Sequence, residues 1–142
     1  EDLSMITTDE LLKELKNADD INKFLSDYEN EFISETPVSF LTQMIALKKT
    51  SIANVAKNSG IGNYVYKFFN NERNPSRNSL IAISFSIGLS VDEASLLLRI
   101  AKFAILDSRD KRDSIIIFGL TNNMSVFEID DLLHKNNFLT IN

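Results

Sequence analysis

The sequence lacks cysteine altogether and holds few residues that interrupt helices. Its 142 residues include no cysteine, no tryptophan, one histidine, two prolines and four glycines. The absence of cysteine excludes a disulfide framework, a thiolate nucleophile and a thiolate metal site. The longest apolar runs, 80–89 and 114–120, fall short of the ~20 residues that span a bilayer. We therefore expect no membrane partner and, because no signal peptide is visible, a cytoplasmic location.

Charge is distributed unevenly along the chain, whose net charge is −5. Residues 1–35 carry 11 acidic and 3 basic side chains, a net charge of −8. Residues 36–78 carry 6 basic side chains and one acidic side chain, a net charge of +5, and residues 79–142 carry −2. The acidic total therefore does not exclude phosphate binding by the middle segment, since a local basic surface decides that contact.

Hydrophobic residues recur at intervals of three and four throughout, which predicts an all-α, single-domain protein without sustained strands. Thr7 and Glu10 have the spacing of a helix-starting capping box. Pro37 marks a boundary, because the residue before proline disfavours helix. A short helix should begin after Ser51 and end near Gly60, and Asn71 should end the next helix in a left-handed conformation.

The C-terminal half contains a duplication at an offset of 35 residues. The segment that begins at Arg77 matches the one that begins at Arg112, and each contains a Ser-x-x-Glu capping box, at Ser90 and Ser125. This pattern predicts two stacked helical hairpins that cover each other's apolar faces. Two hairpins with similar caps that arose independently remain the alternative.

The residue types needed for catalysis are not arranged for it. The sequence has no nucleophile–base pair, phosphate-binding glycine loop or metal-ligand spacing, so we expect no enzyme, no cofactor and no metal site. The alternating charges from Asp107 to Asp113 are interpreted as a solvated linker.

One stretch of the middle segment has a recognisable pattern. Ser51 caps a short helix that contains the small residue Ala56, Gly60 and Ile61 form a turn, and the sequence Phe-Phe-Asn-Asn-Glu-Arg-Asn-Pro-Ser closes the following helix at residues 68–76. With these features, residues 38 to about 103 resemble the Cro/C1, or lambda-repressor-like, helix-turn-helix family. The resemblance implies a core of five short helices and the function of a sequence-specific DNA-binding transcriptional regulator.

Helical spacing divides the third helix of that motif into two faces. Val65 and Phe68 should face inward, and the opposite face should present side chains that hydrogen-bond to base edges in the major groove. The expected base-reading residues are Asn63, Tyr66, Lys67 and Asn70. The expected phosphate-binding residues are Ser51, Lys48, Lys49, Lys57, Arg73 and Arg77.

These patterns divide the chain into an acidic helical segment at 1–35, a helix-turn-helix domain at 36–106 and a helical hairpin at 107–142. Ile115, Ile116, Ile117 and Phe118 follow one another, more apolar surface than one neighbouring helix can cover. We therefore expect double-stranded DNA as the partner and a homodimer through residues 114–138.

A protein-interaction module is the alternative function. Ile52 and Gly62 stand where the family often has Gln and Ser, and neither can contact a phosphate through its side chain. In this alternative the chain keeps the fold and binds a protein partner through its acidic or C-terminal surfaces. Salt-dependent binding to duplex DNA separates the two functions.

Overall fold

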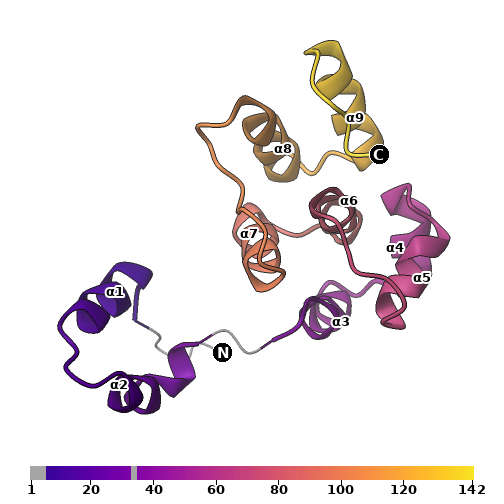
Figure 1. The fold of residues 1–142 in the computed structure, drawn as a ribbon. Helices are drawn as coiled ribbons and strands as arrows, with labels where there is room; N and C mark the ends of the chain where they lie inside the picture. The colour runs from indigo at the N-terminus through magenta and orange to yellow at the C-terminus, as the bar shows by residue number, and fades with distance from the viewer. Residues whose placement is uncertain (1–5, 33–34) are drawn as a thin grey trace. The chain divides into compact units, whose positions relative to one another are not determined.

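The computed structural model describes residues 6–32 and 35–142, and throughout those residues the regular structure is helical, with no strand. The all-α prediction is therefore confirmed (Figure 1). The chain divides into two compact units, Glu1–Ser34 and Glu35–Asn142, where the sequence had predicted a single domain. None of the described helices is long and apolar enough to cross a membrane.

The first unit is small. Its helices are α1 (Thr8–Lys16), α2 (Ile21–Asp27) and the 3-10 turn η1 (Glu29–Glu31). The predicted capping box of α1 is present, with the Thr7 and Glu10 side chains each accepting from the other's backbone N–H. Phe24 is buried, and its ring lies 4.9 Å from that of Tyr28 and 6.3 Å from that of Phe32, measured between centroids.

The second unit holds the main hydrophobic core, whose buried residues run from Phe40 to Ile141. Its helices in chain order are α3 (Pro37–Leu47), α4 (Ile52–Ser59), α5 (Asn63–Phe69), α6 (Arg77–Ile87), α7 (Val91–Ile100), α8 (Lys111–Thr121) and α9 (Val126–Lys135). Helix α6 is central, because it packs against α4, α7 and α9 (Figure 1). Predicted residues 36–106 and 107–142 thus belong to one compact unit.

The helix boundaries follow local chemistry. Pro37 occupies the first turn of α3, where its missing N–H leaves no intrahelical partner unpaired. The Ser51 hydroxyl caps α4 by accepting from the Asn54 backbone N–H. Gly60 has φ +81° and Asn71 has φ +61°, so both predicted left-handed positions are confirmed.

The two segments that match at an offset of 35 residues also have matching backbone features. Ser90 and Ser125 both form reciprocal capping boxes with the Glu three residues later, and they precede α7 and α9, which match in length. Left-handed backbone recurs at the same offset. The two matched pairs are Gly88 with Asn123 and Lys102 with Asn137. The two hairpins therefore have the same kind of turn between their helices and the same kind of C-terminal helix end.

The two hairpins pack through a reciprocal pair of contacts. Arg77, at the start of α6, donates to both carboxylate oxygens of Asp113 in α8, at 3.2 and 2.9 Å. Arg112, its counterpart in α8, donates to the Asn78 side-chain oxygen in α6 at 3.1 Å. Asn78 and Asp113 are themselves 35 residues apart, so the two contacts replace each other when the hairpins are exchanged. The helix pairs α6–α9 and α8–α7 are equivalent under the same exchange.

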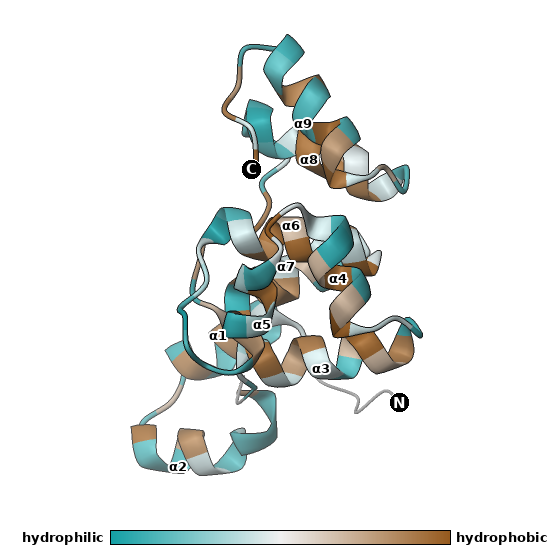
Figure 2. Cartoon of the chain, turned by 90° about the vertical axis from the view of Figure 1, so that its right-hand side faces the viewer, coloured by the Kyte–Doolittle hydropathy of each residue, from teal (hydrophilic) through white to brown (hydrophobic). Residues whose placement is uncertain are grey.

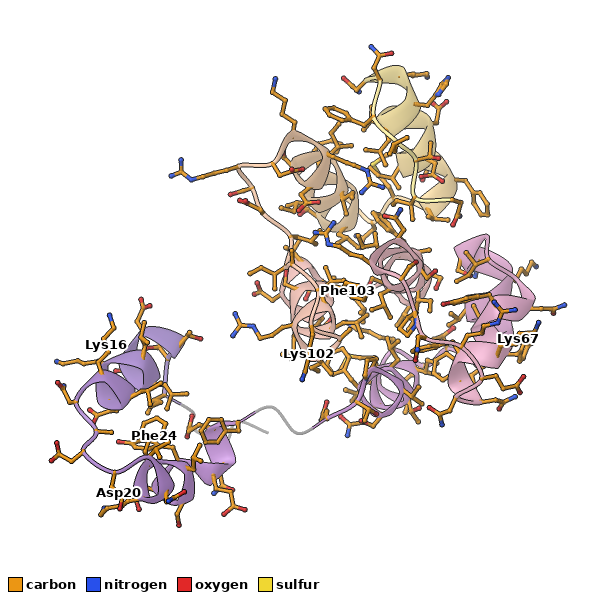
Figure 3. All side chains as sticks on the ribbon, in the orientation of Figure 1. Lys16, Asp20, Phe24, Lys67, Lys102 and Phe103 are labelled. Carbon is orange, nitrogen blue, oxygen red and sulfur yellow. The ribbon has the colours of Figure 1, made fainter. Side chains whose placement is uncertain are left out.

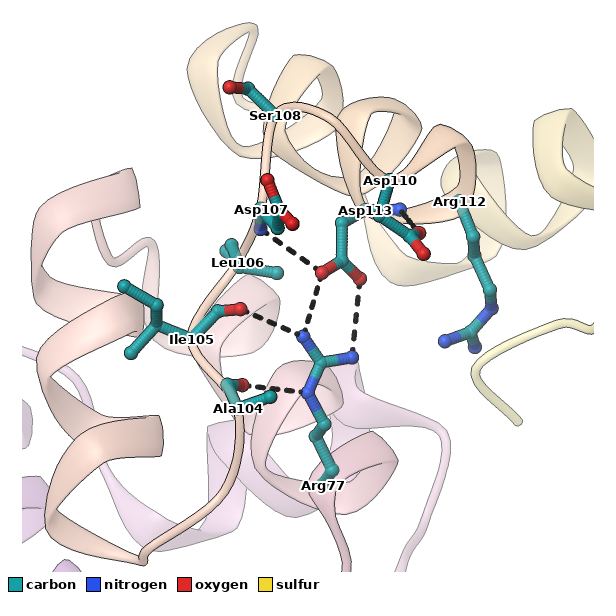
Figure 4. Close-up of a pocket in the computed structure, with 9 residues that line it drawn as sticks. All are labelled: Arg77, Ala104, Ile105, Leu106, Asp107, Ser108, Asp110, Arg112 and Asp113. Carbon is teal, nitrogen blue, oxygen red and sulfur yellow. Dashed lines mark hydrogen bonds and ion pairs between the residues drawn. The ribbon is translucent and has the colours of Figure 1, made fainter.

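Both arginines also hold the extended segment that follows their own hairpin. The Nε of Arg77 donates to the Ala104 carbonyl at 2.9 Å, and the Nε of Arg112 donates to the Leu139 carbonyl at 2.8 Å. Figure 4 shows Arg77 between Asp113 and the Ala104–Ile105 backbone. The interpretation of residues 107–113 as a solvated linker is wrong for Asp113, which is 6% exposed. The sequence gives no direct sign that this carboxylate meets an arginine 36 residues earlier.

We predict that Arg77→Met lowers the free energy of unfolding by about 3–5 kcal/mol, because it leaves the Asp113 carboxylate buried without its cation. Lys135→Ala is the matched control, since it breaks an exposed ion pair with Asp131 and should change stability by less than about 0.5 kcal/mol. Urea denaturation of the two variants measures both values. Equal effects in the two variants would contradict a structural role for the Arg77–Asp113 pair.

Candidate nucleic-acid interface

Helices α4 and α5 pack against each other and are joined by a tight turn. At the end of α4, the Ile61 backbone N–H donates to the Ser59 hydroxyl oxygen at 3.4 Å. Gly60 and Gly62 both have positive φ, at +81° and +55°, which reverses the chain within three residues. Ala56 is buried in α4, where its small side chain allows close helix packing.

The inward face of α5 fixes the helix on the core. Val65 and Phe68 are buried, as the helical spacing predicts. The Tyr64 hydroxyl donates to the Asn74 carbonyl at 2.7 Å and so connects α5 to the loop that follows it. These contacts prevent α5 from rotating, so the direction of its outer face is determined by the core.

The outer face of α5 carries the four residues predicted to read bases. Asn63, Tyr66, Lys67 and Asn70 are all exposed and recur at intervals of three and four, which places them on one side of the helix. Tyr66 is 44% exposed. Figure 3 shows Lys67 extending outward from α5, away from the other helices of its unit. The structure thus brings these four side chains together on an accessible surface.

Three of the predicted phosphate-binding cations are also accessible. Lys49, Lys57 and Arg73 are exposed, and none of them forms a salt bridge with another described residue. They come from the end of α3, the last turn of α4 and the loop after α5. Ser51 is exposed too, and because its oxygen accepts the capping hydrogen bond, its hydroxyl hydrogen can still donate.

Two further predicted cations are paired with carboxylates of the protein. The Arg77 guanidinium donates to Asp113 and to two carbonyls, so we no longer assign it to phosphate binding. The Lys48 ammonium lies 3.0 Å from the Glu93 carboxylate. Partial burial opposes ionisation of Glu93, but hydrogen bonds from the Ser90 backbone and Lys48 hold its pKa below its usual range. Glu93 therefore remains charged and competes with any phosphate for Lys48.

The second hairpin and the segment after it support the turn between α4 and α5, a contact that the sequence had not predicted. The Asn142 side-chain amide donates to the Ser59 carbonyl at 2.9 Å. Asp130 of α9 holds that segment by accepting from the backbone N–H groups of Ile141 and Asn142, at 2.6 and 3.1 Å. A Cβ on Gly60 would collide with the Asn142 amide and lie 3.4 Å from the Phe127 ring.

The comparison of the two matching segments contains one indication of this contact. Phe127 stands where the first repeat has Asp92, and Asp130 stands where it has Ser95. A large aromatic at an otherwise polar position is a departure that indicates a contact specific to the second hairpin. The partner could not be identified, because Ser59 lies 83 residues before Asn142.

The part of the chain that the structure describes contains no group of His, Asp and Glu side chains arranged to hold a metal ion. Comparison with protein-family models, with curated proteins and with solved structures found no match to this chain. Function is therefore inferred from the α4–α5 geometry and its charges.

We predict that Gly60→Ala lowers the free energy of unfolding by about 1 kcal/mol more than Gly88→Ala does, which is the value of the lost Asn142 hydrogen bond. Both glycines are left-handed, so both substitutions strain the backbone alike. Only the Cβ at residue 60 displaces another segment, because a Cβ at residue 88 has no atom within 4 Å. Thermal and urea unfolding of the two variants make the comparison. Equal losses of stability would show that the contact with Asn142 and Phe127 does not constrain the turn.

Proposed function

We propose that this protein is a sequence-specific DNA-binding transcriptional regulator of the Cro/C1 type, with α5 as the helix that enters the major groove. The observation that carries the proposal is the outer face of α5. It combines amide, phenol and ammonium groups on one exposed surface, and the opposite side of the helix is fixed in the core.

The chemistry of this face matches the needs of direct readout. Asn63 and Asn70 can both donate and accept at a base edge, and Asn is suited to the paired donor and acceptor of adenine. Lys67 donates to the acceptors of guanine, and Tyr66 offers a hydroxyl together with an apolar ring for a thymine methyl group. A helix with these groups fits the ~12 Å wide major groove.

The flanking cations supply affinity without sequence preference. Lys49, Lys57 and Arg73 of one copy are exposed on the segments before and after α5 and would each contact a phosphate, assisted by the Ser51 hydroxyl. One reading helix covers only a few base pairs, so we propose that two copies bind half-sites ~34 Å apart. Three cations from each copy give about six phosphate contacts, which corresponds to a slope of log affinity against log salt of about −5.

We predict different effects for the two classes of residue. Lys67→Ala should weaken binding to a selected site by about 1–3 kcal/mol and relax its sequence preference. Arg73→Ala should weaken binding to all sequences alike and reduce the salt slope by about one for each bound copy. Fluorescence titration at two salt concentrations, with a duplex selected from a random pool, measures both effects.

Lys135→Ala is the control for that experiment. It removes one exposed positive charge on α9 that is not among the proposed DNA contacts, and it should leave both affinity and salt slope unchanged. If the folded wild-type protein binds no duplex DNA at low salt, the regulator proposal fails and the protein-interaction alternative replaces it. If all three substitutions weaken binding equally, the contact is non-specific attraction.

We predict that removal of residues 1–34 leaves DNA binding intact or strengthens it, most clearly at low salt. Residues 1–35 carry a net charge of −8, and the shortened protein keeps only Glu35 of that segment. Negative charge on the protein near DNA repels the phosphates. Residues 35–142 contain the whole main core and should fold without that segment. Parallel titrations of the two proteins test this, and weaker binding by the shortened protein would assign residues 1–34 a direct part in DNA contact.

A further inference from the structure

We propose that the outer face of α8, formed by Ser114, Ile115, Phe118 and Thr121, binds the same face of a second copy of this chain. This contact would form the interface of the proposed dimer, and differences between the two matching hairpins indicate it. It does not depend on DNA binding.

The duplicated helices α6 and α8 have different surroundings. In the first hairpin, α6 packs closely against three helices, α4, α7 and α9. In the second hairpin, α8 packs closely against two, α7 and α9, which are equivalent to the neighbours α9 and α7 of α6. The position beside α8 that corresponds to α4 has no close helix partner among the residues of the second unit.

The missing neighbour leaves a large hydrophobic side chain exposed. Ile83 of α6 is fully buried, at 0% exposure, whereas its counterpart Phe118 in α8 is 54% exposed. Leu80 is likewise fully buried, and its counterpart Ile115 is only partly buried. Figure 2 shows hydrophobic residues along α8. This side of α8 therefore exposes Phe118 and part of Ile115 where the matching side of α6 is buried.

The second hairpin does not keep hydrophobic residues wherever a neighbour is missing. Helix α7 packs against α3, and its counterpart α9 has no such close partner. There the sequence has become polar. Ile100 of α7 is buried, and its counterpart in α9 is Lys135, which pairs with Asp131 at the surface. Because α9 is polar where it lacks a neighbour, the hydrophobic Phe118 and Ile115 of α8 indicate a face that is covered in the functional state.

The charge pattern identifies a second copy as the partner. No charged residue occurs between Asp113 and Glu128, a stretch that includes most of α8. In a two-fold dimer, residues near the axis meet their own copies, so a charge there would face a like charge. The uncharged face of α8 avoids that repulsion in a chain whose net charge is −5. An oppositely charged partner, by contrast, would have no complementary charge to bind there.

Sedimentation velocity of the full-length protein without DNA tests the inference. Wild-type protein should form dimers at micromolar concentration, and Phe118→Glu should weaken dimerisation about 30-fold or more, as expected for a central aromatic contact. Leu96→Glu is the matched control. Leu96 is an exposed hydrophobic residue of α7, at 42%, and its counterpart in α9 is already the acidic Asp131. That control should remain dimeric.

Circular dichroism of both variants distinguishes lost association from lost folding, since a folded monomer of Phe118→Glu is the expected result. A wild-type monomer, or a Phe118→Glu dimer as stable as the wild type, overturns the inference. A wild-type monomer that becomes a dimer when residues 1–34 are removed shows that the chain's own first unit covers α8, and this also overturns it. A dimer that binds no duplex DNA leaves the inference standing and refutes the proposed function.

Discussion

The packing of one helical hairpin on its duplicate depends on a buried arginine–carboxylate contact. Arg77 offers its donors to both oxygens of Asp113 and to the carbonyls that follow α7, and the carboxylate also accepts from the Asp107 backbone N–H. Removing both charges from water is costly, and only a set of hydrogen bonds this complete offsets that cost. The main contribution of the pair is therefore to fix how the two hairpins align with each other, and its contribution to net stability is smaller.

The alignment of the two hairpins also determines what lies beside α4. With the hairpins fixed, α9 lies along α6 and its following segment reaches the end of α4. Gly119 contributes to this approach, because a side chain there would collide with Ile129 and Phe85. The α4–α5 turn consequently rests on residues that belong to the duplicated hairpin. The two-helix motif, which already packs on α6, thereby gains a second support at its turn.

The sequence predicted what depends on local chemistry and missed what depends on distant contacts. Caps at Ser51 and Ser90, the left-handed Gly60 and Asn71, and the outer face of α5 follow from residues within one or two turns. The Arg77–Asp113 and Asn142–Ser59 contacts join residues separated by 36 and 83 positions, and no local pattern specifies such a pairing. Arg77 illustrates the difference, since its basic charge predicted a phosphate contact that its buried partner precludes.

The same hairpin connects the two proposals in physical terms. In the proposed dimer, α8 meets its copy and the adjoining α9 braces the turn before α5 through Asp130 and Asn142. The path from the dimer axis to each reading helix then consists of packed helices and a hydrogen-bonded segment, without a flexible linker. Rigid support of this kind reduces the conformational freedom that binding would otherwise remove. The spacing between the two α5 helices would therefore be a property of the free dimer, so DNA would select that spacing and would not have to induce it.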